Sequence, residues 1–115
     1  VIGMIAEVGE KVVGFMIYEL HKTRLHFLNL AVLPEYHRCG IGSQLVDKLI
    51  KKLSTHRRAH ITIDLRESNL NAHLFFRTMG FKAKKVNRCF YDDTGEDGYH
   101  FKFTVKKESE IQNDY

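Results

Sequence analysis

Two glycines and two polar residues stand together between a strand-like and a helix-like segment. Gly40 and Gly42 are separated by one residue, Arg38 comes shortly before them, and Ser43 follows them. The start of a helix carries unpaired N–H groups and the positive end of the helix dipole, and it therefore binds phosphate groups. Glycine lets the backbone approach the phosphate oxygens, and arginine adds a fixed positive charge. Residues 38–43 therefore predict a pyrophosphate-binding loop, with a turn that needs glycine only for its geometry as the alternative.

The spacing of these glycines excludes two familiar nucleotide motifs. No Gly-Lys-Ser/Thr sequence ends the segment, so it is not a nucleotide P-loop. The dinucleotide-binding pattern needs a third glycine, whereas Ser43 to Leu45 continue directly into the predicted helix. The two motifs therefore fit poorly, which leaves a different kind of phosphate site or a plain turn that needs glycine for its geometry.

The segments on either side of this loop predict a sheet of mixed strand direction. A hairpin is expected at Gly9 and Glu10, where two runs rich in Val, Ile, Phe and Tyr meet. The central strand–helix–strand–helix passage favours parallel pairing, and the hairpin favours antiparallel pairing beside it. The other expected strands lie at residues 24–33, 60–65, 81–91 and 98–105.

Two helices are expected to cover this sheet. The second begins at a cap formed by Ser68 or Asn69 and ends at Gly80. The element order is therefore β-β-β-α-β-α-β-β, and the fold class is an α/β domain with a mixed central sheet and flanking helices. The first helix follows the glycines and carries one apolar stripe, formed by Ile41, Leu45, Val46, Leu49 and Leu53.

Length and composition predict one domain of ordinary globular character. The chain has 115 residues, 43% of them hydrophobic, and a formal net charge of +4. We expect a single domain at residues 1–105 and a polar tail at 106–115. No apolar run is long enough to cross a bilayer and no signal peptide is visible, so we expect a cytoplasmic protein that makes no membrane contact. Cys39 and Cys89 lack metal-ligand spacing, which predicts no metal site and two free thiols, with a disulfide between them as the alternative.

The passage at residues 29–50, "NLAVLPEYHRCGIGSQLVDKLI", resembles the acetyl-coenzyme A binding motif of the GNAT family of N-acetyltransferases. That motif reads Gln/Arg-x-x-Gly-x-Gly/Ala between a strand and a helix. Gly40 and Gly42 stand at its glycine positions, and His37 replaces its Gln/Arg. A second passage, "IDLRESNLNAHLFFRTMGF", resembles the strand and helix that close the cofactor site, most closely in RimI-like enzymes that acetylate protein N-termini. The resemblance extends from the first hairpin to about Val105.

This resemblance implies the GNAT fold, here apparently without its N-terminal strand and helices, and acetyl-coenzyme A as the cosubstrate. The strand at residues 28–33 would separate from its neighbour around a bulge and bind pantetheine through backbone groups of Leu30, Ala31 and Val32, with one N–H polarising the thioester carbonyl. Asn69 would contact the pantetheine arm. The pyrophosphate would be held by Arg38, Cys39, Gly40, Ile41, Gly42 and Ser43.

The resemblance also implies which residues carry out the acetyl transfer. At two of these positions the chain differs from the family's usual residue. Asp64 stands where RimI-like enzymes have a glutamate base, so we expect it to remove the amine proton through a water, although its side chain is one methylene shorter. The structural alternatives are an ion pair between Asp64 and Arg66 and a cap of the strand end by Asp64. Phe76 replaces the tyrosine that protonates the leaving thiolate, which predicts a slower enzyme, with Tyr91 and Tyr99 as substitute donors.

The acceptor is the least determined part of the interpretation. Family members carry a first strand and one or two helices before the first hairpin, and these build the acceptor side. We therefore expect either that such a part was trimmed or that a second copy of the chain covers the open sheet edge, as in a homodimer. A protein N-terminal amine is the first choice of acceptor, with lysine, a small amine, or non-catalytic acyl-coenzyme A binding as alternatives. Nucleic-acid binding is the weakest, because the basic residues lack interleaved aromatic side chains.

Overall fold

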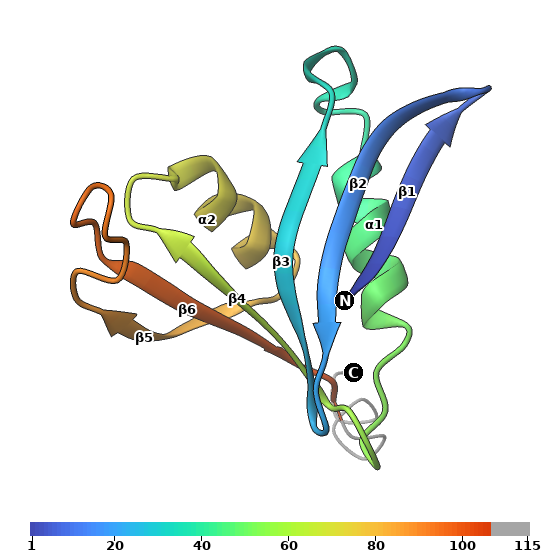
Figure 1. Ribbon diagram of the computed structural model, residues 1–115. Coiled ribbons are helices and arrows are strands. Elements are labelled where there is room, and N and C mark those ends of the chain that lie inside the picture. Colours follow the sequence, from blue (N-terminus) through green and yellow to red (C-terminus); the bar gives the residue numbers. More distant parts are fainter. Residues whose placement is uncertain (107–115) are drawn as a thin grey trace.

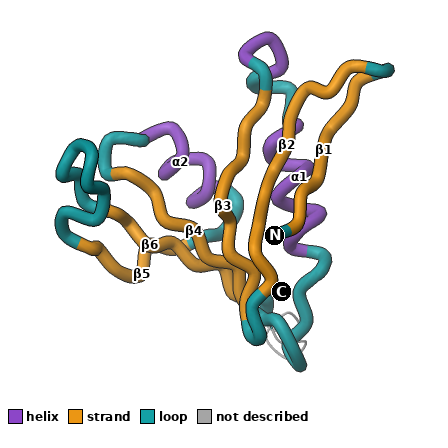
Figure 2. Tube along the Cα trace, viewed as in Figure 1, coloured by secondary structure: helices purple, strands orange, loops and turns teal. Residues whose placement is uncertain are grey.

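The computed structural model describes residues 1–106 of the chain, so the expected polar tail lies, apart from its first residue, outside the described residues. Figures 1 and 2 show the arrangement of the elements. In chain order they are β1 (Ile2–Val8), β2 (Lys11–Leu20), β3 (Arg24–Val32), the short 3-10 helix η1 (Pro34–Tyr36), α1 (Ile41–Ile50), β4 (His60–Arg66), α2 (Leu70–Thr78), β5 (Lys82–Asn87) and β6 (Gly98–Thr104). The predicted element order is therefore confirmed.

The strands of this described part form one six-stranded sheet in the order β1-β2-β3-β4-β6-β5. Neighbouring strands are antiparallel except β3 and β4, which are parallel. The parallel pair exists because α1 connects β3 to β4 and returns the chain to the starting end of the sheet. The predicted mixed sheet is confirmed, including the hairpin turn, where Gly9 takes a positive φ of 63°.

The sheet opens into a fork between β3 and β4. The two strands pair only over Arg24–His26 and His60–Thr62 and then diverge, as Figure 1 shows for the β1–β3 and β4–β6 groups. On the other side of β3, the register against β2 shifts: Ile17 lies opposite Asn29 and Tyr18 lies opposite Phe27. Leu28 is therefore an extra residue, and such a bulge bends the strand. The predicted separation of this strand around a bulge is confirmed.

Both helices cover the same face of the sheet. Leu45, Val46 and Leu49 of α1 and Phe76 of α2 are buried in one cluster with apolar residues from the strands. Along β4, the buried residues Ile61, Ile63 and Leu65 alternate with more polar ones. Side chains of a strand point to opposite faces in turn, so Asp64 lies on the face that these helices leave open.

The boundaries of α2 follow from its sequence. The Asn69 side chain caps the helix, because its Oδ1 accepts a hydrogen bond of 3.3 Å from the Ala72 N–H. After the helix, Gly80 takes a φ of 97°, a conformation that favours glycine and ends the helical turn. These two residues fix where α2 starts and stops beside β4, as predicted.

The β1 strand forms one edge of the sheet and exposes apolar side chains there. The Ile5 side chain is 57% exposed and the Val8 side chain is 49% exposed. Unpaired strand edges of this kind are templates for pairing with another chain. The homodimer therefore stays a prediction. Among residues 1–106, no helix has the length and apolar character that a membrane span requires.

Candidate active site

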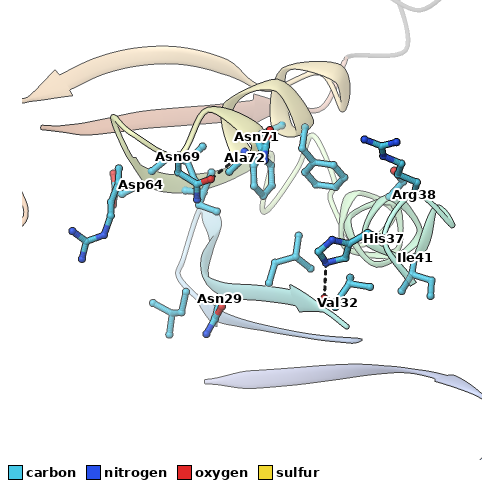
Figure 3. A pocket seen from close by; sticks show the side chains of 18 of the residues that line it. Asn29, Val32, His37, Arg38, Ile41, Asp64, Asn69, Asn71 and Ala72 are labelled. Atoms are coloured by element: carbon cyan, nitrogen blue, oxygen red, sulfur yellow. Dashed lines mark hydrogen bonds between the residues drawn. The ribbon is translucent and has the colours of Figure 1, made fainter. Parts of the chain in front are cut away.

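The fork between β3 and β4 holds a cavity of about 730 Å³. Side chains of β3 line one wall, and β4 with α2 lines the other wall. Figure 3 shows Asp64 toward one end of the cavity and Arg38 and Ile41 toward the other. The predicted site residues that line it are Leu30, Val32, Arg38, Gly40, Ile41, Gly42, Ser43, Asp64 and Asn69, whereas Ala31 and Cys39 do not line it.

One end of the cavity is formed by the loop that enters α1. Gly40 is the N-terminal cap of α1 with a φ of 79°, and no side chain caps this helix. The first intrahelical bond runs from the Gln44 N–H to the Gly40 carbonyl, so the N–H groups of Ile41, Gly42 and Ser43 have no partner within the helix. These N–H groups and the helix dipole make this end of the cavity favourable for an anion.

Arg38 holds an unusual backbone conformation in this loop. Its φ is 65°, in the left-handed region that favours glycine. The next residue, Cys39, is exposed, and its N–H donates to the Tyr36 carbonyl at 3.3 Å. The Cys39 amide is therefore engaged in the turn that precedes the glycines, which leaves it a structural part of the loop.

His37 connects this loop to the free edge of β3. Its Nε2 donates a hydrogen bond of 2.8 Å to the Val32 carbonyl oxygen (Figure 3). The imidazole thus uses one of the backbone acceptors that face the fork. The residue at the Gln/Arg position of the motif therefore fixes the loop against the strand.

The backbone of β3 presents alternate residues to the fork. The Leu33 N–H donates to the Val13 carbonyl at 2.8 Å, and the register continues as Val32–Gly14, Ala31–Phe15 and Leu30–Met16. In an antiparallel pair, only every second residue exchanges hydrogen bonds with its partner strand. Ala31 therefore bonds to β2, while the N–H and C=O groups of Leu30 and Val32 point toward the fork. Leu30, Ala31 and Val32 were each expected to bind pantetheine through the backbone, but the N–H and C=O of Ala31 point toward β2.

Asp64 lies at the other end of the cavity, in contact with two histidines. Its Oδ1 accepts a hydrogen bond of 2.7 Å from His100 Nδ1, and its Oδ2 lies 3.7 Å from His26 Nε2. Arg66 does not pair with it, because the Arg66 guanidinium bonds to Asp93 and Glu96 at 3.0 and 3.3 Å. One structural alternative for Asp64, an ion pair with Arg66, is therefore wrong.

Tyr91 enters the cavity from the loop between β5 and β6. Its ring lies under the Arg66 guanidinium, 4.1 Å from the ring centroid to Cζ, and the same guanidinium is held by Asp93. Burial, and then the charge of Asp64, raises the pKa of Tyr91 above its usual value. The phenol therefore keeps its proton at neutral pH. Tyr99, the other tyrosine considered, packs against the His73 ring and does not line the cavity.

Phe76 lines the cavity but belongs mainly to the core. Its side chain is 3% exposed, and its ring packs edge-on against Phe27, Phe75 and Phe81. The neighbouring Phe75 ring closes the site on the side of α1, since a Cβ atom on Gly42 would lie 3.4 Å from Phe75 Cζ. Gly42 therefore lies next to the Phe75 ring of α2, and a Cβ at this position would make only ordinary van der Waals contact with that ring.

Sequence reasoning missed two groups of this site, His26 and His100, and named Tyr91 as a candidate donor without placing it. His26 and His100 reach Asp64 only through the strand register, and the sequence separation of 36 residues to His100 hides the contact. The placement of Tyr91 depends on the Arg66 contacts within its loop. Across residues 1–106, no group of three or more metal-ligating side chains could hold a metal ion.

Residues 2–83 match the family described as "Acetyltransferase (GNAT) domain", which is about seven-tenths of the chain. The chain belongs to the GNAT acetyltransferase family. This membership agrees with the order of strands and helices, with the fork between β3 and β4, and with the glycines at the start of α1.

Two curated relatives that are similar to this GNAT domain are named as N-acetyltransferases. The chain is 36% identical over 75 residues to an N-alpha-acetyltransferase of Sulfurisphaera tokodaii, covering 64% of this chain and 44% of that protein. It is 30% identical over 84 residues to the [ribosomal protein bS18]-alanine N-acetyltransferase of Escherichia coli K12, covering 73% of this chain and 57% of that protein. The chain therefore spans about half the length of these relatives.

Solved structures with the same fold extend the comparison. The ribosomal-protein-S18-alanine N-acetyltransferase from Escherichia coli superposes with a TM-score of 0.79 at 25% identity, covering 93% of this chain and 72% of that one. A GNAT family acetyltransferase from Elizabethkingia anophelis, solved with acetyl-CoA bound, gives a TM-score of 0.78 at 17% identity, covering 88% and 74%. At this identity the second match establishes the fold alone.

Proposed function

We propose that this chain carries the cofactor and acetyl-transfer site of an N-acetyltransferase that acetylates protein N-terminal amines with acetyl-coenzyme A. One observation carries the proposal: a single cavity joins an anion-binding helix start, a free strand edge and a carboxylate. Each of these features suits one part of the reaction. The helix start suits the pyrophosphate, the strand edge suits the pantetheine amides, and the carboxylate suits the amine.

The cofactor would lie along the fork from α1 toward Asp64. The N–H groups of Ile41, Gly42 and Ser43, together with the Arg38 charge, would hold the pyrophosphate. The backbone groups of Leu30 and the Val32 N–H would pair with the pantetheine arm as a further strand would. Asn69, already committed to capping α2, borders this path and would contact the arm. Bound acetyl-coenzyme A would supply the activated acetyl group.

Asp64 would serve as the base for the incoming amine. The side chain lies on the helix-free face of the sheet and at the cavity wall, so an amine can approach from that face. The amine nitrogen would lose its proton toward Asp64 as it forms a bond to the thioester carbon. One N–H group of the β3 edge would stabilise the oxyanion that forms at the carbonyl oxygen. The carbon–sulfur bond then breaks and releases the thiolate.

Tyr91 is our choice for the group that returns a proton to the thiolate. It lines the same cavity, and its raised pKa keeps the phenol protonated at neutral pH. Phe76 has no proton to give, although it occupies the position of the family's tyrosine. The donor would therefore come from the β5–β6 loop instead of from α2.

The choice of a protein N-terminus rests on the relatives. Both curated relatives are named for acetylation of an α-amine, one of them at the alanine of a ribosomal protein. Such an acceptor is made in the cytoplasm, which we propose as the compartment. A lysine side chain is the competing acceptor, and the peptides chosen for the experiment separate the two.

The experiment is calorimetric titration of the chain with acetyl-coenzyme A, followed in the same sample by release of free thiol. One peptide begins with a free Ala and contains no lysine. A matched peptide has the same sequence with a blocked N-terminus and one lysine. We expect binding, and thiol release with the first peptide only. We also expect an Asp64→Asn variant to bind acetyl-coenzyme A unchanged and to release thiol about 100-fold more slowly.

The other outcomes have definite meanings. Release with the blocked lysine peptide alone would change the acceptor from an α-amine to a side-chain amine. Binding without release from either peptide would favour an acyl-coenzyme A binding module, for which Phe76 at the family's acid position is the supporting observation. Absence of binding would contradict the proposal for the glycine loop.

A further inference from the structure

Leu28 is the extra residue of the bulge in β3, and it lies where the fork begins. His26 and Thr62 are the last residues that pair between β3 and β4, so Leu28 and Asp64 each follow two positions later on the separating strands. Figure 3 shows Asn29, the next residue of β3, toward the same end of the cavity as Asp64. Leu28 therefore borders the end of the cavity at which the acceptor amine would react.

The Leu28 side chain is apolar, yet it is 50% exposed and lines the cavity. Nine other large apolar side chains of residues 1–106 are 43% to 86% exposed, and none of these nine lines the cavity. Burying an exposed apolar side chain against a ligand removes its surface from water and stabilises the complex. Leu28 is thus the exposed apolar contact that meets a molecule entering the cavity beside Asp64.

Tyr91 supplies a second surface of the cavity, and its position is fixed by several contacts. Arg66 Cζ lies 4.1 Å from the centroid of the Tyr91 ring, and the same guanidinium donates to both carboxylate oxygens of Asp93 at 3.0 Å. The Tyr91 N–H donates to the Glu96 carbonyl at 3.1 Å, and the Tyr91 carbonyl accepts from the Gly95 N–H at 2.8 Å. The ring is therefore held by its own backbone and by the stacked guanidinium.

Phe90 fixes the same loop against the sheet. It packs so closely on Gly98, the first residue of β6, that a Cβ atom at Gly98 would lie 2.8 Å from the Phe90 ring. The Phe90 ring also meets the Tyr91 ring edge-on, with 5.1 Å between the centroids. An acceptor would therefore meet a preformed surface, which lowers the ordering cost of binding.

We propose that Leu28 and Tyr91 contact the side chain of the acceptor's first residue, and that they select an apolar first residue over a charged one. This inference deepens the proposed acetyl transfer and rests on it. The Cβ atom of a first residue is two bonds from the α-amine nitrogen, so its side chain must lie at the Asp64 end of the cavity when the amine reacts. A lysine side chain has no branch near its amine, so the contact suits an α-amine.

The charges at this end of the cavity work against an acidic first residue. The Asp64 side chain lines the cavity and is 22% exposed, so it is partly shielded from water. A second carboxylate brought beside it would be repelled, and more strongly than in bulk water. Arg66 does not offset this repulsion, because Asp93 and Glu96 already engage its guanidinium. The charge and the apolar contact therefore favour the same class of acceptor.

The test compares two lysine-free peptides that differ only in their first residue, Leu or Gly. Thiol release gives kcat/KM for each, and glycine has no side chain that could contact Leu28. We expect the Leu-to-Gly ratio of kcat/KM to fall about three- to tenfold in Leu28→Ala, since a half-exposed contact discriminates less than a closed apolar pocket. Leu20→Ala is the matched control, because Leu20 is 48% exposed at the end of β2 and does not line the cavity. A ratio that Leu28→Ala leaves unchanged would overturn the role of Leu28.

Two variants of Tyr91 separate the contact from the proposed proton transfer. Tyr91→Phe keeps the ring and removes the hydroxyl, so we expect kcat to fall with both peptides and the Leu-to-Gly ratio to stay the same. Tyr91→Ala removes the ring as well, and we expect the ratio to fall about three- to tenfold. An equal fall of the ratio in the two variants would assign the effect to the hydroxyl and overturn the apolar contact.

A second pair of peptides tests the selection against charge. Asp and Asn have nearly the same shape, so Asp-starting and Asn-starting peptides differ chiefly by one negative charge. We expect kcat/KM to be about tenfold lower with the Asp-starting peptide at low ionic strength, and the difference to narrow in about 1 M salt, which screens charges. Equal values at low ionic strength would contradict the selection against charge.

Peptide binding without turnover separates this inference from the proposed function. Calorimetric titration of the chain saturated with coenzyme A measures peptide affinity when no acetyl group can be transferred. We expect the Leu-starting peptide to bind more tightly than the Gly-starting one, and this difference to disappear in Leu28→Ala and to persist in Leu20→Ala. If the difference is found but no peptide releases thiol from acetyl-coenzyme A, the proposed acetyl transfer has failed and the contact stands. If thiol is released but neither affinity nor kcat/KM depends on Leu28, the transfer stands and the contact is overturned.

Discussion

His37 Nε2 donates a hydrogen bond of 2.8 Å to the Val32 carbonyl oxygen, which joins the glycine loop to the free edge of β3. The acceptor faces the fork because Val32 alternates with residues that bond to β2. The contact therefore sets the distance between the proposed phosphate end of the cavity and the proposed pantetheine edge. Loss of this contact should affect cofactor binding before it affects the fold.

We expect His37→Ala to weaken acetyl-coenzyme A binding about three- to tenfold, because one hydrogen bond contributes roughly 0.5–1.5 kcal/mol. His37→Gln is the matched control, since its amide can still donate to the Val32 carbonyl. Calorimetric titration measures both variants. Equal weakening in the two variants would show that the imidazole ring itself, and not the donor, is needed.

Arg38 should respond differently to two substitutions. Both Arg38→Gly and Arg38→Ala remove the charge, so both should weaken acetyl-coenzyme A binding by a similar factor. Only glycine relieves the positive φ of 65°, which costs an L-residue about 1–2 kcal/mol. We expect Arg38→Gly to melt a few degrees higher than Arg38→Ala in thermal unfolding. Equal melting temperatures would contradict the strained conformation.

Much of the fold followed from local patterns. The hairpin at Gly9, the cap at Asn69 and the end of α2 at Gly80 each depend on residues within a few positions of one another. The apolar stripe of α1 was likewise readable, because helical periodicity assigns its face. The fork itself came from the family resemblance and is confirmed by the divergence of β3 and β4.

The details of the candidate site depend on long-range register, which the sequence does not reveal. The sequence predicts that Ala31 binds pantetheine through its backbone. The Leu33–Val13 hydrogen bond, which fixes the register, shows instead that the N–H and C=O of Ala31 point to β2. His100 meets Asp64 because β4 and β6 pair with one particular register. A shift by one residue would place His100 on the other face. Such contacts depend on tertiary structure, which local propensity leaves open.

Gly40 and Gly9 offer a matched comparison. Both have positive φ, 79° and 63°, and a Cβ atom at either would meet no atom within 4 Å. Each Gly→Ala change should therefore cost about 1–2 kcal/mol of unfolding free energy from backbone strain. Only Gly40→Ala should also weaken acetyl-coenzyme A binding, by about tenfold or more, because it moves the N–H groups at the start of α1. Chemical denaturation and calorimetry give the two numbers, and a similar loss of affinity in Gly9→Ala would contradict the assignment.

Arg66 should hold the β5–β6 loop in a pH-dependent way. Its hydrogen bond lowers the pKa of Asp93, and hydrogen bonds from Ser68, Thr94 and Arg66 lower the pKa of Glu96. A carboxyl with a lowered folded-state pKa stabilises the fold above its ordinary ionisation range, and this contribution disappears as the pH falls through the lowered value. We expect Arg66→Ala to melt below the parent chain at pH 7 and to approach it below about pH 4.

Arg66→Ala should also slow turnover, since Tyr91 loses the guanidinium that holds its ring. Arg88→Ala is the control, because Arg88 pairs with Asp97 in the same loop through an exposed contact of 3.2 Å, whereas the guanidinium stacked on the Tyr91 ring is that of Arg66. Thermal unfolding across pH and thiol release at pH 7 measure both effects. A melting difference that stays constant down to pH 3 would argue against the carboxylates as its source.

Phe76 offers the most direct test of whether a proton donor at the family's tyrosine position is needed. Because its ring lines the cavity, a Phe76→Tyr hydroxyl should reach the cavity and supply a second proton donor for the thiolate. We expect kcat to rise severalfold with the Ala-starting peptide and the melting temperature to change little.

Phe81→Tyr is the matched control, since Phe81 is 2% exposed, packs on Phe76 and does not line the cavity. Its buried hydroxyl should cost about 1–3 kcal/mol with no gain in kcat. An unchanged kcat in Phe76→Tyr, together with a loss of stability like that of Phe81→Tyr, would show that thiolate protonation does not limit the reaction.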